Sequence, residues 1–324
     1  MTHHDRYARQ VILPQIGSDG QDRLNAAHIL VIGAGGLGVP VLQYLVGSGV
    51  GQITLLDQDP VEEHNLHRQT IYGAHVGLPK VMAAAQFCRT LNASVKINPI
   101  ENWLTPANAP DLVAQADLVL DCADSFAASY TLSDLCLTLN KPLVSSSVTA
   151  MAGYVGGFCG GAPSLRAVFP EVPLNPGTCA SAGVVGPVVG MFGALQAQMA
   201  LSVLLGLTPS PLGQIFRFDM LGMRSSTFRF DSAQEPKNAP HRFIARADVT
   251  SDDFVVELRS PAETPHLLAP HAQRFAVSDF GRDGPMPSIG QRAIFVCRSG
   301  LRAWNAADRL RPYWAGEIAL LADL

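Results

Sequence analysis

Four charged residues in the N-terminal half of the chain are of types suited to binding a nucleotide. Asp57 and Asp124 each follow an apolar segment, and Arg68 and Lys80 lie between them in the sequence. Arginine and lysine cations neutralise phosphate oxygens, whereas one acid can accept hydrogen bonds from a ribose diol and another can hold magnesium on the phosphates. Any one of these residues alone would ordinarily be a solvated surface charge. As an ordered set, they predict a nucleoside triphosphate site.

The elements expected around these residues form the strand, turn and helix of a dinucleotide-binding fold. An apolar segment at 29–32 runs into a glycine-rich turn at 33–38, and a helical stretch follows at 39–46. Glycines let the backbone approach phosphate oxygens at a helix N-terminus. Further apolar strands at 53–56 and 118–120 end at the two acids, on the edge where open parallel sheets bind ligands. The candidate nucleotide-binding residues are Gly33, Gly35, Gly36, Gly38, Asp57, Asp59, Asn65, Arg68, Lys80 and Asp124.

A nicotinamide dinucleotide fits the glycine turn and Asp57 as well as ATP does. A nicotinamide-dependent oxidoreductase, however, would leave Arg68, Lys80 and Asp124 without a role, because a dinucleotide needs fewer cations than a triphosphate. We therefore favour ATP with Mg²⁺, the metal being held by Asp124, and keep the oxidoreductase as an alternative.

Several motifs occur in one order and resemble those of the ThiF/MoeB/HesA family, relatives of the ubiquitin-activating enzymes, over about residues 5–230. The matching stretches are RYARQVILPQIG (6–17), VIGAGGLG (31–38), LLDQDPVEEHNLHRQT (55–70), VGLPK (76–80), DCADSF (121–126) and TCASAGVVGP (178–187). The resemblance implies an α/β fold, with a Rossmann-like ATP-binding domain built on a mostly parallel sheet.

The activity implied by this resemblance is ATP-dependent adenylation of the C-terminal Gly-Gly of a small ubiquitin-like sulfur carrier protein, of the thiamine or molybdopterin biosynthesis type. The attacking carboxylate is already ionised, so catalysis requires positioning and charge neutralisation rather than a general base. Arg9 matches the family arginine that reaches the phosphates of the neighbouring subunit in a homodimer. A persulfide donor such as a cysteine desulfurase is a further implied partner. The expected catalytic residues are Arg9, Arg68, Lys80, Asp124, Cys179 and Cys297.

Cys179 follows Gly177 and Thr178 and precedes a long apolar segment of helical character. A position near a helix N-terminus would lower the pKa of its thiol. By resemblance it occupies the sulfur-transfer position of the family, where it can attack the acyl-adenylate or form an acyl disulfide. The alternative is a buried, unreactive cysteine.

The C-terminal part is expected to be a separate small α/β module. We predict an adenylating domain at 1–232, a polar linker at 233–248 and the module at 249–324. The loop Cys297-Arg298-Ser299-Gly300-Leu301-Arg302 resembles the active-site loop of rhodanese sulfurtransferases, in which backbone amides and arginines stabilise a thiolate or persulfide. Glu257 stands where that family usually has aspartate. A domain kept only for packing is the alternative, as is a sulfurtransferase that acts through Cys297 alone.

Two departures from the family pattern stand out. Most bacterial members bind a structural zinc through two CxxC pairs, but CxxC occurs nowhere in this chain, so we predict no zinc site. Ser125 and Ser129 replace an asparagine and an arginine beside the strand-end acid, which would weaken the site. These losses also suit a non-catalytic homologue that binds the carrier without turnover.

Composition excludes several other classes. The net charge is −4 and no basic run occurs, which argues against nucleic-acid binding. Six cysteines without disulfide-like spacing and no signal peptide predict a cytoplasmic protein. The uncharged segment 183–207 is long enough to span a bilayer, but Pro187, Gln196 and Gln198 indicate a helix buried inside the protein instead. The family resemblance implies that this helix lies in the core near the dimer interface.

Overall fold

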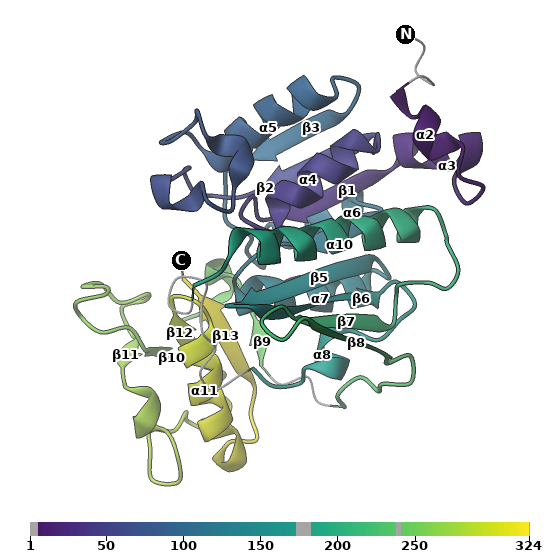
Figure 1. Cartoon of the computed structure of the whole chain (residues 1–324). Coiled ribbons are helices and arrows are strands. Elements are labelled where there is room, and N and C mark those ends of the chain that lie inside the picture. The colour runs from purple at the N-terminus through teal and green to yellow at the C-terminus, as the bar shows by residue number, and fades with distance from the viewer. Residues whose placement is uncertain (1–5, 173–182, 238–240, 324) are drawn as a thin grey trace.

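A computed structural model describes residues 6–172, 183–237 and 241–323 of the chain (Figure 1). Its larger sheet has eight strands in the order β3-β2-β1-β4-β5-β6-β7-β8, of which the first five are parallel and the rest antiparallel. The strands are β1 (His28–Ile32), β2 (Gln52–Leu56), β3 (Lys96–Ile100), β4 (Leu118–Asp121), β5 (Pro142–Thr149), β6 (Ala152–Cys159), β7 (Gln214–Asp219) and β8 (Arg224–Arg229).

The central strand β1 shows why this sheet is covered on both faces. Ile29 and Val31 pack into one core with α4, α5 and α10, whereas Leu30 and Ile32 pack into a second core with α6, α7 and α8. A strand that is apolar on both faces is typical of a parallel sheet between two helix layers. The helices are α2 (Ala8–Val11), α3 (Gly17–Ala26), α4 (Gly38–Gly47), α5 (Lys80–Leu91), α6 (Ala109–Gln115), α7 (Phe126–Thr138), α8 (Leu165–Val168) and α10 (Gly186–Leu204), with short 3-10 turns η1 (Glu63–Asn65) and η2 (Thr70–Tyr72).

Helix α10 is the long apolar segment that the sequence analysis assigned to the core. Within the described ranges it is the one helix long and apolar enough to cross a membrane. It packs on β5 and β6 and lies against α4, where Gly193 approaches Leu37 and Pro40 closely. Its apolar length is therefore explained in part by packing between the sheet and α4.

A second sheet follows, with five parallel strands in the order β11-β10-β12-β13-β9. Its elements are β9 (Arg242–Phe243), η3 (Arg246–Asp248), β10 (Phe254–Glu257), β11 (Gln273–Arg274), η4 (Val277–Asp279), β12 (Ala293–Cys297), α11 (Leu301–Leu310), η5 (Arg311–Tyr313) and β13 (Ile318–Ala322). Helix α11 covers one face, and residues of connecting segments cover the other. We call this part the C-terminal unit. Its first strand, β9, lies inside the stretch 233–248 predicted as a linker. Because β9 pairs with β13, this part of the stretch belongs to the second sheet.

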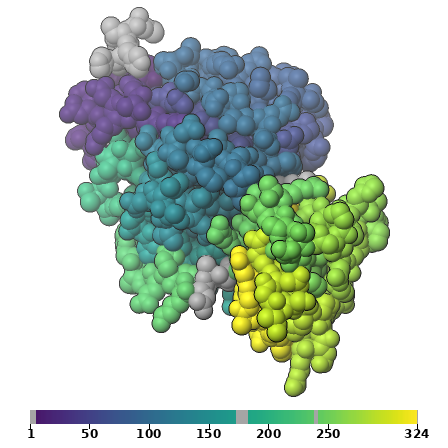
Figure 2. Space-filling model, turned by 180° about the vertical axis from the view of Figure 1, so that it is seen from behind, coloured from purple at the N-terminus to yellow at the C-terminus, as the bar shows by residue number. Residues whose placement is uncertain are grey.

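The C-terminal unit packs against the first unit (Figure 2), and α7 is one of the elements that it contacts. Tyr130 of α7 and Trp304 of α11 have ring centroids 5.0 Å apart. The buried Arg166 guanidinium lies over both rings, at 4.8 and 5.4 Å from their centroids, and forms an ion pair with Asp134. It also donates a hydrogen bond to the carbonyl of His241, next to β9. The two units therefore share one hydrophobic core and a buried cation.

Candidate nucleotide-binding and active site

The glycine turn joins β1 to α4, and two of its glycines leave no space for a side chain. Gly33 has φ +98°, and a Cβ there would lie 2.6 Å from the carbonyl oxygen of Cys122 at the end of β4. A Cβ on Gly38 would lie 2.1 Å from the carbonyl oxygen of Gly33. Gly33, Gly35 and Gly36 line a cavity, whereas Gly38 does not. Gly38 thus permits the helix to start close to the strand, and the other three present backbone to the cavity.

Asp57 at the end of β2 holds the glycine turn in place. One carboxylate oxygen accepts a hydrogen bond from the amide of Ala34 at 2.7 Å, and the other accepts from the amide of Asp59 at 2.8 Å. The hydroxyl of Tyr72 donates to the Ala34 carbonyl at 2.8 Å from the other side. Burial raises the pKa of the Asp57 carboxyl, and the ammonium of Lys80 opposes that rise.

The two predicted cations both line the same cavity. Lys80, the first residue of α5, is buried, and its Nζ lies 2.8 Å from a carboxylate oxygen of Asp59. Arg68 is half-buried and donates to the carbonyl of His64 at 3.2 Å. Asn65 is buried and accepts a hydrogen bond from the amide of Glu62. These residues come from the segment between β2 and α5, which folds over the glycine turn.

Asp124 follows β4 and lies exposed at the wall of the cavity, just before α7. Behind it, Asp121 is fully buried, and burial raises the pKa of its carboxyl, while the hydrogen bond that the Ser145 hydroxyl donates to it at 2.8 Å opposes that rise. Ser129 stands at the position of the expected family arginine. The Ser129 hydroxyl donates to the Ser125 carbonyl at 3.3 Å, at the start of α7.

The residues described so far surround one large cavity of about 1110 Å³, above the usual range for small-molecule sites. All predicted nucleotide-binding residues except Gly38 line it. A turn of backbone amides at a helix start, with a lysine and an arginine beside it, is suited to a polyphosphate. Beyond this part, which lies over β2, β1 and β4, the cavity extends along β5 and β6 to the C-terminal unit. The lining there includes Tyr130, Ser145, Ser146, Ser147, Thr149, Tyr154, Phe169, Phe243 and Ala322.

The lining from the C-terminal unit was not found by sequence reasoning. Phe243 and Ala322 lie in strands of the second sheet, far along the chain from the glycine turn. Phe243 fell within the predicted linker, and a two-residue strand has no periodicity to reveal it. Aromatic residues at 130, 154 and 169 were also missed, because the local sequence does not distinguish an aromatic residue that lines a cavity from one that packs in the core.

Of the predicted catalytic residues that the structure describes, Arg9 and Cys297 do not line the cavity. Arg9 is exposed on α2 and does not line it. Cys179 lies outside the described residues. Cys297, at the end of β12, is fully buried, and its Sγ accepts a hydrogen bond from the amide of Ala303 in the first turn of α11 at 3.3 Å.

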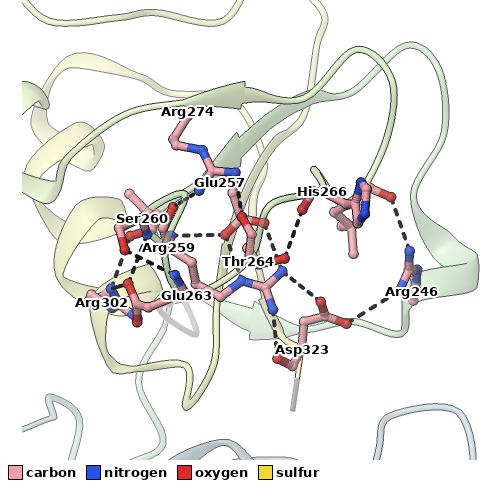
Figure 3. A network of polar contacts seen from close by, with 12 residues as sticks. Arg246, Glu257, Arg259, Ser260, Glu263, Thr264, His266, Arg274, Arg302 and Asp323 are labelled. Atoms are coloured by element: carbon pink, nitrogen blue, oxygen red, sulfur yellow. Dashed lines mark hydrogen bonds and ion pairs between the residues drawn. The ribbon is translucent and has the colours of Figure 1, made fainter.

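Arginines near the Cys297 loop are engaged with carboxylates of the same unit (Figure 3). Arg302 forms an ion pair with Glu263 at 2.6 Å and donates to the carbonyl of Leu258. Arg259 pairs with the buried Glu257 at 2.8 Å and with Asp323 at 2.7 Å. Glu257, which occupies the position of the expected aspartate, thus anchors the end of β10.

Hydrogen bonds join two loops where the resemblance places the zinc-binding cysteine pairs. The amide and the hydroxyl of Ser164 both donate to Glu235, at 2.7 and 2.5 Å. The same hydroxyl also accepts from the amide of Ala167 and so caps α8. Residues 238–240, in the second of these loops, lie outside the described part of the chain.

Comparison with known proteins identifies the family of the first unit. Residues 7–239 match the ThiF family. The chain is 45% identical over 220 residues to the bovine (Bos taurus) adenylyltransferase and sulfurtransferase MOCS3, an alignment that covers 67% of this chain and 48% of that relative. It is 42% identical over 227 residues to the sulfur carrier protein adenylyltransferase of Thermus thermophilus, covering 67% of this chain and 83% of that relative. The chain thus spans only about half the length of MOCS3.

Solved structures agree on the fold. The crystal structure of E. coli MccB with MccA-N7isoASN superposes with a TM-score of 0.62 at 20% identity, covering 72% of this chain and 73% of that one. That of PaaA superposes with a TM-score of 0.59 at 22% identity, covering 70% and 73%. These likenesses establish the Rossmann-like architecture of the first unit. The match over residues 7–239 shows that the chain belongs to the ThiF family.

Proposed function

We propose that this protein is an ATP-dependent adenylyltransferase that activates the C-terminal Gly-Gly of a small ubiquitin-like sulfur carrier protein. The observation that carries the proposal is the cavity itself, in which Asp57, Arg68, Lys80 and Asp124 meet from separate segments around the glycine turn. The names of its relatives support the same reaction, since the Thermus thermophilus relative is a sulfur carrier protein adenylyltransferase.

The proposed reaction is attack of the carrier carboxylate on the α-phosphorus of ATP, with pyrophosphate as the leaving group. Because two anions approach each other, Arg68 and Lys80 have to neutralise charge and hold the phosphates in line. Lys80 is well placed for this because burial at the start of α5 fixes its stem. Asp57, through Ala34, keeps the glycine turn in the conformation that presents its amides.

Asp124 is the residue we assign to magnesium. It is exposed at the cavity wall, and Mg²⁺ is usually held by one or two carboxylates together with substrate phosphates. The donor set therefore fits a magnesium–ATP complex. When bound, the metal would supply further positive charge to the leaving pyrophosphate.

Three further proposals concern assembly, sulfur and location. Arg9 would act on the site of a second copy, since in its own chain it is exposed and outside the cavity; this supports a homodimer.

Cys297 and Cys179 are the candidate sulfur-transfer residues, with a persulfide donor as partner. The N–H that Ala303 directs at Cys297 Sγ supports a sulfur atom held in a fixed position there. We place the protein in the cytoplasm.

The test is carrier-dependent exchange of pyrophosphate into ATP. The purified protein is assayed with Mg²⁺ and a panel of small carriers that end in Gly-Gly, and the acyl-adenylate is identified by mass spectrometry. Exchange with one carrier, lost in Asp124→Ala and retained in the exposed control Asp111→Ala, is the expected result. Measurable ATP binding without exchange for every carrier would favour a non-catalytic carrier-binding protein.

A further inference from the structure

The cavity has a second compartment whose walls come from both units. It lies over β5 and β6, on the far side of β4 from the glycine turn. Tyr154 and Phe169 of the first unit stack with ring centroids 5.0 Å apart, and the hydroxyl of Tyr130 donates to the Phe169 carbonyl at 2.8 Å. Phe243 and Ala322 of the C-terminal unit also line the cavity.

Phe243 is held firmly in this wall. It lies in β9, paired with β13 opposite Leu320, and only 6% of its surface is exposed. Its ring rests on Gly300, where a Cβ would come within 2.6 Å of a ring carbon. Gly300 has φ +83° and also lies close to Ala127 of α7. A ring packed on a glycine backbone, between two units, is pre-organised to shape a binding site.

The chemistry of this compartment differs from that of the phosphate end. Among the residues that the structure describes, its lining consists of aromatic rings, the hydroxyl-bearing residues 145–147 and 149, and aliphatic side chains. The one charged residue in this described lining, Glu171, is exposed. A charged side chain in such surroundings would lose its hydration without gaining a partner. An uncharged, extended chain of small residues would fit, because its peptide planes can pack between rings and its polar groups can bond to hydroxyls.

We propose that the C-terminal unit is part of the substrate site, with Phe243 forming a wall along which the last residues of the carrier tail pass toward the phosphates. The inference rests on the proposed adenylation. When the phosphates of ATP occupy the end of the cavity at the glycine turn, the carrier tail that bears the attacking carboxylate has to extend through the rest of the cavity. That space runs over β5 to Phe243. Ala322, which also lines it, pairs in register with Cys297, so the cysteine loop lies on the strand next to this wall.

Substitution of Phe243 tests the inference in the full-length protein. Phe243→Ala is expected to raise the KM for the carrier about tenfold, the equivalent of one aromatic contact, and to leave the Kd for ATP unchanged. Phe243→Leu should restore most of the affinity. The matched control is Phe275→Ala, a half-buried phenylalanine of the same unit that does not line the cavity and packs on Phe280.

An unchanged carrier KM in an active Phe243→Ala protein would overturn the inference alone. Absence of carrier-dependent exchange in the unsubstituted protein would overturn the proposed function and this inference with it. Equal loss in Phe243→Ala and Phe275→Ala, together with weakened ATP binding, would show general damage and contradict a specific contact.

Photocrosslinking supplies a readout that does not depend on turnover. With p-benzoylphenylalanine at position 243, the carrier should crosslink through its last residues, and a carrier lacking the terminal Gly-Gly should not. The same photoreactive residue at position 275 serves as the control. Crosslinks to the body of the carrier, or equal yields at both positions, would overturn the assignment.

Discussion

Two strand–turn–helix connections of this molecule, which we call corners, have the same topology but different surroundings. β1 leads through the glycine turn into α4, and β12 leads through the Cys297 loop into α11, each at the carboxyl end of a parallel strand. The first corner opens on a cavity, with Lys80 and Arg68 in its wall. At the second, the thiol is fully buried. A strand–turn–helix corner is thus a potential site, and the surrounding residues decide whether a ligand can reach it.

The two corners also differ in how their cations are paired. Lys80 at the first corner pairs with Asp59, whose side chain is 49% exposed, so a phosphate can approach that pair from the cavity. At the second corner Arg259 is paired with the buried Glu257 and with Asp323. Hydrogen bonds to these acids raise the pKa of the Arg259 guanidinium. The charge of Arg259 therefore stabilises the C-terminal unit and is not available to a ligand.

The largest effect is expected from removing the buried cation of the first corner. Lys80→Ala should reduce carrier-dependent pyrophosphate exchange by about 10²–10³-fold, as loss of one pre-organised electrostatic group does. Lys96→Ala, at an exposed position of β3, is the matched control and should leave exchange unaltered. An exchange rate for Lys80→Ala close to that of the control would show that Lys80 has only a structural role.

The glycine turn offers a stability test within one helix. Gly38→Ala should lower the free energy of unfolding by ~1–3 kcal/mol, because its Cβ would strike the Gly33 carbonyl in a packed corner. Gly47→Ala, at the other end of α4 with open space around it, should raise that free energy by up to ~1 kcal/mol. Urea unfolding of both proteins measures the difference. Equal shifts would mean that the turn has room to relax.

The strand–turn–helix geometry of the first corner could be predicted from the sequence because its signals are local. Gly33, Gly35 and the acid at the end of β2 sit at spacings fixed by one strand, one turn and the next strand. The same reasoning placed Cys297 at a strand end, as found, but could not foresee its burial. Burial there depends on the pairing of β12 with β13 and on the core that Cys297 shares with residues of α7 and α11, which are set by the tertiary fold. Phe243 was missed for the same reason.

The closed second corner predicts slow chemistry at its thiol. Because Cys297 is fully buried, its alkylation by iodoacetamide should be on the order of a hundredfold slower in the native protein than in urea, since reaction requires local opening. Peptide mapping by mass spectrometry separates it from the other cysteines. Cys297→Ser should leave pyrophosphate exchange unchanged. Rapid native labelling, or loss of exchange in this variant, would contradict the contrast between the two corners.

The smallest effect concerns the acid that engages Arg302. The hydrogen bond from Arg302 lowers the pKa of the Glu263 carboxyl from 4.5 to about 2. Because the pKa of the folded state is the lower one, the stability that this pair contributes is present above pH 4.5 and is lost as the pH falls toward 2. Carboxyl NMR titration should find Glu263 ionised well below the other exposed glutamates, and Arg302→Gln should return its pKa toward the usual value. A normal pKa in the unsubstituted protein would mean that Arg302 is not held by Glu263 in solution and is available to a ligand at the Cys297 loop.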